Sequence, residues 1–192
     1  MTPRRRIMRA LLGGLLVLVA GCAPFVLASG KQSIPERQFE IMVPDGWFRV
    51  MRGDGAELLV ITRDGLLLQQ IVIGRFAVEK ELKFTKRRFD EKLPPHEVAE
   101  IELDNMRSNP EAHNFSVEEN VPATICGHQG YKLVYTWALK GGYRLKRVHY
   151  GFLDDKWVYR IIFQAAARYY FDRDLPVFEN MRESFRLTGT RA

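Results

Sequence analysis

The chain has 192 residues, of which 46% are hydrophobic and 27% are charged. Its net charge of +6 reflects 29 Lys and Arg against 23 Asp and Glu, but four of the arginines lie within residues 1–21, which contain no acid. The remaining residues therefore carry 25 basic and 23 acidic side chains, a net charge of +2. This balance removes most of the electrostatic basis for binding nucleic acid, and we expect no nucleic-acid partner.

Residues 1–21 have the layout of a secretory signal rather than of a folded domain. An apolar run from Ala10 to Ala20 is preceded by Arg4, Arg5, Arg6 and Arg9. The run has about 11 residues, whereas a permanent transmembrane helix needs about 20. We therefore predict a removable signal peptide over residues 1–21.

The apolar run ends in Val19-Ala20-Gly21-Cys22, which resembles the lipobox of bacterial lipoproteins. The resemblance implies cleavage before Cys22 and attachment of acyl chains such as palmitate, which would hold the protein on a membrane. Two or more chains anchor a protein stably where one does not. In enteric bacteria, an aspartate directly after the acylated cysteine resembles a signal for retention in the inner membrane. Ala23 stands at that position here, so the outer membrane, facing the periplasm, is favoured over the inner membrane. The alternative is a buried apolar helix with an incidental cysteine.

Only one further cysteine, Cys126, is present. Acylation would use the sulfur of Cys22, so no intramolecular disulfide is expected. Cys126 fits a small hydrophobic residue at a strand or turn, with an intermolecular or redox-active thiol as the alternative.

Residues 22–37 lack steady periodicity, and we expect a lipidated tether there, followed by a single globular domain over residues 38–192. Alternation at Phe39, Ile41 and Val43 predicts a strand. Two apolar runs, 58–62 and 66–76, flank Asp64-Gly65, a dipeptide typical of hairpin turns.

A helix is predicted after Pro94-Pro95, with an apolar face at Val98, Ala99, Ile101, Leu103 and Met106. Three strands at 131–139, 143–152 and 157–165 follow as an antiparallel meander. Helical spacing of Leu175, Phe178, Met181 and Phe185 predicts a closing amphipathic helix packed on the sheet. The fold class expected is α+β, a largely antiparallel sheet with helices packed on it.

The stretch Phe39-Glu40-Ile41-Met42-Val43-Pro44-Asp45-Gly46-Trp47 resembles the opening of the PsbP-like family of α/β/α sandwich domains. The meander and the stretch from Met181 to Leu187 are similar to that family's last strands and terminal helix. The family includes envelope lipoproteins of the DcrB type, and the resemblance implies an accessory or assembly role without a shared catalytic centre. It carries over no functional residue, because Pro44, Gly46 and Trp47 look structural.

The sequence contains no complete motif of a catalytic or metal-binding site. His96 and Glu100 lie four residues apart at a helix start, but the second histidine of a zinc-protease motif is replaced by Glu100. The sequence contains no nucleophile elbow, phosphate-binding glycine loop or dinucleotide fingerprint. We expect no catalytic residues, no metal, no cofactor and no enzymatic activity.

One basic segment remains, in which cations alternate with Phe84 and Phe89. Its members include Lys80, Lys83, Lys86, Arg87 and Arg88. Lys83, Lys86, Arg87 and Arg88 are candidates for contact with an anionic surface or an acidic partner. The alternative is a solvated connection whose aromatic residues cover the core. A second candidate patch is Tyr169-Tyr170-Phe171, with the start of the last helix as the alternative.

The sequence thus favours a lipid-anchored, non-enzymatic accessory or assembly factor of the bacterial cell envelope that acts through contact with an envelope protein. The alternative is a binder or carrier of a small apolar or anionic ligand. The identity of the partner or ligand and the oligomeric state are not encoded in any motif.

Overall fold

The computed structural model describes residues 25–50 and 58–188. The predicted signal peptide and Cys22 lie outside these ranges, so the lipobox stays a prediction. The elements are β1 (Phe25–Ile34), the short 3-10 helix η1 (Pro35–Arg37), β2 (Phe39–Val50), β3 (Leu58–Thr62), β4 (Gln69–Ala77), α2 (Pro95–Arg107), β5 (His113–Ile125), β6 (His128–Ala138), β7 (Arg144–Asp154), β8 (Trp157–Ala166), α3 (Tyr170–Glu183) and β9 (Arg186–Leu187).

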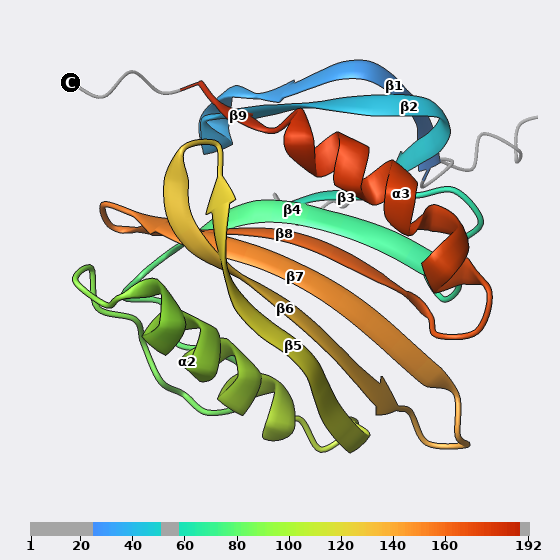
Figure 1. The fold of residues 1–192 in the computed structure, drawn as a ribbon. Coiled ribbons are helices and arrows are strands. Elements are labelled where there is room, and N and C mark those ends of the chain that lie inside the picture. Colours follow the sequence, from blue (N-terminus) through green and yellow to red (C-terminus); the bar gives the residue numbers. More distant parts are fainter. Residues whose placement is uncertain (1–24, 51–57, 189–192) are drawn as a thin grey trace, which may run out of the picture.

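The strands form one sheet in the order β1-β2-β3-β4-β8-β7-β6-β5, and β9 pairs with the start of β2. Every neighbouring pair is antiparallel. In Figure 1, α3 lies above the sheet and α2 below it. The predicted α+β class, a largely antiparallel sheet with helices packed on it, is confirmed.

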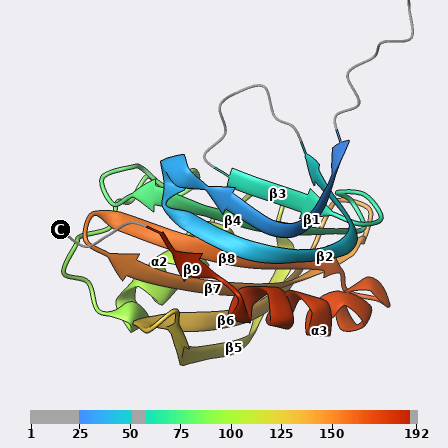
Figure 2. The same ribbon diagram turned by 90° about the horizontal axis from the view of Figure 1, so that it is seen from above.

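Alternation along the central strands divides the core into two parts. On β6, Tyr131, Leu133 and Tyr135 face α2, while Val134 faces the α3 side. The α3 side is rich in aromatic residues: Phe163 stacks on both Phe171 and Phe178, with ring centroids 5.5 and 5.4 Å apart. α3 contacts β8, β2 and β4 on this side, and Figure 2, seen from above, shows β1 and β2 on the same side of the molecule as α3.

The predicted hairpin, helix, meander and closing helix are all present. β3 and β4 pair around the Asp64-Gly65 turn, with Ile61 opposite Ile71. α3 ends at Glu183, so Phe185 lies just beyond the helix instead of on it. Phe185 is nevertheless buried in the same core, 5.5 Å from the ring of Phe39.

The segment expected as a tether, residues 22–37, differs from expectation in its described part. Phe25–Ile34 is strand β1, paired along its length with β2, and η1 follows it. The pairing shifts register between Ala28 and Gly30, where β1 advances by two residues and β2 by four, so the bulge lies in β2. Ala28 is the one residue of β1 that is buried, and the strand therefore has little hydrophobic signal. The globular sheet therefore begins at Phe25 and not at residue 38.

The residues shared with the PsbP-like opening have structural roles, as expected. Trp47 is 1% exposed in the core, and Gly46 has a φ of 82°, a left-handed conformation that suits glycine. Gly46 lies within the bulge of β2, between Val43, which pairs with Gly30, and Trp47, which pairs with Ala28.

Cys126 lies in the two-residue turn between β5 and β6, with a φ of 50° beside Gly127 at 83°. Positive φ at both central residues defines a type I′ hairpin turn. The side chain is half-buried against the core, as expected for a small hydrophobic residue at a turn, and its thiol is free.

Candidate partner-binding groove

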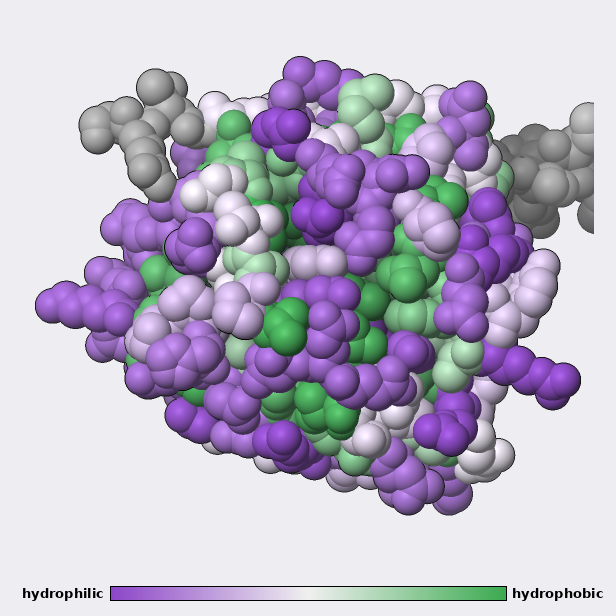
Figure 3. Space-filling view, viewed as in Figure 1, coloured by the Kyte–Doolittle hydropathy of each residue, from purple (hydrophilic) through white to green (hydrophobic). Residues whose placement is uncertain are grey.

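A groove of about 380 Å³ runs along the α3 side of the sheet, between α3 and strands β5, β6 and β7. Figure 3 shows apolar side chains at the surface among charged ones on this face of the molecule. The apolar part of the lining is Val134, Val148, Phe171 and Leu175, and the charged part is Glu118, Glu119, Lys132, Lys146 and Glu179.

The lining follows from strand periodicity. Val134 and Val148 are cross-strand partners, and the lysines two residues before each of them, Lys132 and Lys146, share their face. A bulge in β5 between Val117 and Glu119 inserts Glu118, so that two consecutive glutamates line one groove. The groove therefore has an apolar floor with charged walls.

Each lysine of the groove is bridged to an acid. Lys132 Nζ lies 2.9 Å from Glu119 Oε2, and Lys146 Nζ lies 2.7 Å from Glu118 Oε2. Lys146 also sits 4.8 Å from the centre of the Phe171 ring, a cation–π contact with α3. These pairs hold the long side chains over the floor, where a partner can exchange them for its own charges.

Glu179 of α3 lines the groove and is held by two neighbouring side chains. The Tyr150 hydroxyl donates to Glu179 Oε1 at 2.9 Å, and Arg182 Nε lies 2.8 Å from Glu179 Oε2. Burial and the nearby Glu179 carboxylate raise the pKa of the Tyr150 hydroxyl, so it stays a hydrogen-bond donor at neutral pH. The groove is chemically suited to hold an extended or amphipathic protein segment.

A buried polar cluster lies on the opposite side of the sheet, under α2. Arg160 Nε is 2.6 Å from Glu102 Oε1, Arg147 donates to the Tyr135 hydroxyl at 3.0 Å, and the Tyr131 hydroxyl is 3.5 Å from His149 Nε2. Burial, together with the charges of Arg160 and Arg147, holds the pKa of His149 well below its usual range. His149 is 2% exposed, so its imidazole is enclosed in the core, whereas Arg160 and Tyr131 each reach the wall of a surface pocket.

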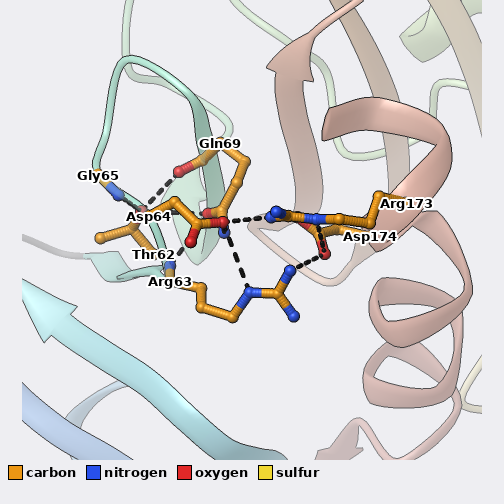
Figure 4. Close-up of polar contacts among 7 residues, drawn as sticks. All are labelled: Thr62, Arg63, Asp64, Gly65, Gln69, Arg173 and Asp174. Carbon is orange, nitrogen blue, oxygen red and sulfur yellow. Dashed lines mark hydrogen bonds and ion pairs between the residues drawn. The ribbon is translucent and has the colours of Figure 1, made fainter. Parts of the chain in front are cut away.

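A second polar cluster joins the β3–β4 turn to α3 (Figure 4). The fully buried Asp174 accepts from Arg63 at 2.7 Å and from Arg173 Nε at 3.0 Å, and Arg173 also contacts Asp64. Burial alone would raise the pKa of Asp64, but its hydrogen bond and ion pair with Arg173 and the charge of Arg63 hold it below its ordinary value. These pairs fix the turn against the helix.

The basic segment flanks α2, and the structure separates its members. Arg87 forms an ion pair with Asp104 of α2 at 3.1 Å, and Arg88 forms one with Glu81 at 2.8 Å, although both side chains stay exposed. Lys83 lies 5.0 Å from the ring of Phe84, and Lys86 occupies a turn with a φ of 59°. Of the two aromatic residues that the solvated-connection alternative places over the core, Phe89 is buried under α2 and Phe84 is half-buried.

A pocket of about 190 Å³ beside this segment brings Lys80 and Lys83 together with Arg160 of β8, which sequence spacing did not suggest. Phe76 forms part of its wall, and the Arg160 guanidinium lies 4.3 Å from the centre of that ring. Lys86, Arg87 and Arg88 are not among the lining residues.

His96 and Glu100 do not come together as a metal site. Glu100 accepts a hydrogen bond from Asn120 of β5 at 2.8 Å, and His96 lines a separate pocket of about 290 Å³ with Tyr131. Within residues 25–50 and 58–188, no cluster of three metal-ligating side chains is found.

The aromatic triplet at the start of α3 divides between surface and core. Tyr169 is 63% exposed at the start of the helix with a φ of 73°, while Phe171 is buried. Arg173 lies under the ring of Tyr169, 5.3 Å from its centre. The triplet is therefore the start of the helix, and Tyr169 alone offers an aromatic surface.

Phe171, in the aromatic triplet, and Leu175, in the closing helix, are the groove residues that the sequence singled out, and neither was predicted to line a groove. The paired positions Lys132/Val134 and Lys146/Val148 carry a detectable signal, because two strands repeat the same charged-then-apolar step. Tertiary packing places these four residues beside α3, and sequence spacing alone could not predict that contact. In the described ranges, no helix is long and apolar enough to cross a membrane.

No family model matches the sequence, and a comparison with curated proteins finds no match. Solved structures are similar, however. Cyanobacterial PsbP (CyanoP) from Synechocystis sp. PCC 6803 aligns with a TM-score of 0.56 and 13% identity over 88% of this chain and 95% of its own. LpqN of Mycobacterium tuberculosis, described as involved in cell envelope biogenesis, aligns with a TM-score of 0.55 and 13% identity over 79% of this chain and 83% of its own.

The Ran-binding protein Mog1p of Saccharomyces cerevisiae gives a TM-score of 0.54 and 8% identity over 85% of this chain and 97% of its own. At such identities the likeness establishes the fold and no activity. The chain therefore has the PsbP-like fold that its opening motif predicted.

Proposed function

We propose that the protein is a lipid-anchored, non-enzymatic accessory or assembly factor of the bacterial cell envelope, which binds a protein partner in the groove beside α3. The groove carries the proposal, because apolar floor residues ringed by exchangeable ion pairs suit a protein segment. The two polar clusters are ion-paired within the fold, through Arg160 and Glu102 in one and Arg63 and Asp174 in the other. The anchor rests on the lipobox at Cys22, and the outer membrane facing the periplasm is its proposed location.

Similar structures support this proposal at the level of fold. LpqN is described by its involvement in cell envelope biogenesis and Mog1p by its binding of Ran, so the same fold serves both an envelope role and protein binding elsewhere.

In-cell crosslinking tests the groove. A photo-crosslinking residue in place of Glu118 on the groove wall should capture one dominant envelope protein, identified by mass spectrometry. Lys146→Glu, which reverses a charge inside the groove, should reduce the adduct several-fold. The matched control is Lys156→Glu, an exposed lysine in the turn after β7, which should leave the adduct unchanged.

Equal adducts in both variants, or no protein enriched above an unrelated lipoprotein, would argue against groove binding. The anchor is tested separately: Cys22→Ser should abolish incorporation of labelled palmitate. Undiminished label in that variant would place the acyl group elsewhere.

A second candidate is a binder of a small anionic ligand, favoured by the pocket of about 190 Å³ where Lys80, Lys83 and Arg160 converge. Ligand at 100 times its dissociation constant stabilises a protein by about 2.7 kcal/mol. Thermal unfolding with the small-molecule fraction of an envelope extract should then show a raised Tm that Lys83→Glu removes. An unchanged Tm in the wild-type protein would reject this candidate.

A further inference from the structure

The exposed apolar side chains of this protein gather at one end of the sheet. Ten large hydrophobic side chains are exposed in the described ranges, and eight of them lie at this end; Met42 and Val121 are the others. Phe25, Val26 and Leu27 open β1, and Phe48 lies opposite Leu27 near the end of β2. Leu66 and Leu67 occupy the β3–β4 turn.

Strand pairing shows that these segments share one end. Phe25 pairs with Val50, so β1 begins where β2 ends. Gln69, which follows the β3–β4 turn, pairs with Ala165 near the end of β8. A cavity of about 290 Å³ lined by Phe25, Phe48 and turn residues 62, 63 and 65 joins the β1–β2 part to the turn.

Two tyrosines extend the same surface. The Tyr143 hydroxyl, from the β6–β7 turn, donates to the carbonyl oxygen of Leu67 at 2.7 Å. Tyr169 is held beside the β3–β4 turn by Arg173, which contacts both the tyrosine ring and Asp64. We call these eight side chains the apolar end, at the right of Figures 1 and 2, where β1 begins.

We propose that the apolar end rests on the lipid bilayer that holds the acylated N-terminus. The inference depends on the proposed anchoring at Cys22, which precedes Phe25 by three residues. Because a chain extends by at most 3.6 Å per residue, the Cα atom of Cys22, from which the acylated sulfur projects, lies within roughly 11 Å of the start of β1. So short a connection keeps this end, and not another, against the bilayer.

The chemistry of the apolar end fits a membrane interface. Leucine and phenylalanine side chains partition among the lipid chains, whereas tyrosine prefers the headgroup region, where its ring is buried and its hydroxyl is hydrated. Exposed Lys140 and Arg168 lie in the turns beside Tyr143 and Tyr169, and residues 139–144 and 167–169 contain no acid. These cations suit the phosphates of an anionic leaflet.

The test uses the full acylated protein purified from membranes, in a Cys126→Ser background. A polarity-sensitive fluorophore is attached at Leu67→Cys or, as matched control, at Val121→Cys, an exposed apolar position on edge strand β5. Acylation is verified by mass spectrometry, and the protein is reconstituted in vesicles of phosphatidylethanolamine and phosphatidylglycerol. Quenching by lipids with a nitroxide near the headgroup is then measured at both positions.

We expect several-fold stronger quenching and a blue-shifted emission at position 67 and little change at position 121. Equal, weak quenching in acylated protein that floats with the vesicles would overturn the inference and leave the anchor intact. A blue shift at position 67 that grows with protein concentration, without quenching, would assign the apolar end to a second copy of the chain and overturn it as well. Purified protein without acyl chains would overturn the anchoring and the inference together.

Discussion

Gly151 of β7 has no room for a side chain. A Cβ atom there would lie 2.1 Å from the hydroxyl oxygen of Tyr131, which is itself buried against the α2 side. We expect Gly151→Ala to lower the free energy of unfolding by about 3 kcal/mol, because the ring is enclosed and the core must shift to admit a methyl group. Urea unfolding followed by circular dichroism measures the loss.

The same substitution in a Tyr131→Leu background is the control. Since the clash is with the tyrosine ring, Gly151→Ala should cost clearly less there, and the double-mutant cycle should show coupling. An equal cost in both backgrounds would trace the effect to backbone conformation and not to Tyr131.

His149 should make stability depend on pH. Burial and the charges of Arg160 and Arg147 lower its pKa in the folded protein, while the unfolded chain has the ordinary value near 6.5. Below about pH 6.5 the unfolded state binds a proton that the folded state does not, so stability falls as pH falls, by about 1 kcal/mol for each pH unit. The effect should be visible between pH 6.5 and 5, before carboxylates titrate.

Unfolding free energies of His149→Gln and wild-type protein across that window test this linkage. The variant should show a flatter dependence, whereas His113→Gln, at an exposed position of β5, should retain the wild-type slope. Parallel curves for wild type and His149→Gln would show that other groups govern the pH dependence.

At the scale of elements, the ion pairs around Asp174 fix α3 to the β3–β4 turn. Asp174 is fully buried, and its loss would leave the Arg63 and Arg173 guanidinium groups without their shared partner. Because both arginines are partly exposed and can be rehydrated, we expect Asp174→Asn to destabilise the protein by about 2 kcal/mol, below the usual loss for a broken buried pair.

Hydrogen exchange locates that loss. Amide protection should fall in the first turns of α3 and in the β3–β4 turn, while the β6–β7 pairing should exchange as in the wild type. Asp172→Asn, an exposed acid in the same first turn, is the matched control and should change little. Uniform loss of protection across the sheet would show that the pair supports the whole fold and not this junction.

Prediction from sequence succeeded for the elements with a strong apolar signal. β2 alternates from Phe39 to Val43, α2 presents one apolar face, and the three meander strands are apolar on both faces because they lie between the two parts of the core. β5 was missed because it contains a bulge between Val117 and Glu119 that interrupts the two-residue repeat. β1 and β5 are also the outermost strands of the sheet and bury little, so their sequences carry a weak hydrophobic signal.

The candidate sites depend on the whole molecule. Lys132 and Lys146 are far from Phe171 and Leu175 along the chain, and only the packing of α3 makes them neighbours. Likewise Phe25, Leu67 and Tyr169 lie on three separate segments, which antiparallel pairing brings to one end. Sequence spacing can propose an anchor at Cys22, but it cannot show which surface the anchor would place against a membrane.

The groove and the apolar end share no lining residue, so changes in one should leave the other intact. Leu66→Ser with Leu67→Ser replaces two exposed apolar side chains in the β3–β4 turn and should expose that turn to added protease on membranes. The groove adduct of the same protein should persist. Lys146→Glu should have the opposite effects: the groove adduct should be reduced, and the β3–β4 turn should remain protected from the protease.

Crosslinking yield and cleavage at the turn, measured on the same membrane preparation, test this separation. Independent responses would indicate that the bilayer orients the domain while the groove remains open to a partner along the side of the sheet. If the serine pair also abolished the adduct while the fold, judged by circular dichroism, was retained, the apolar end would be part of the partner interface. The bilayer contact would then have to be reassigned to that protein.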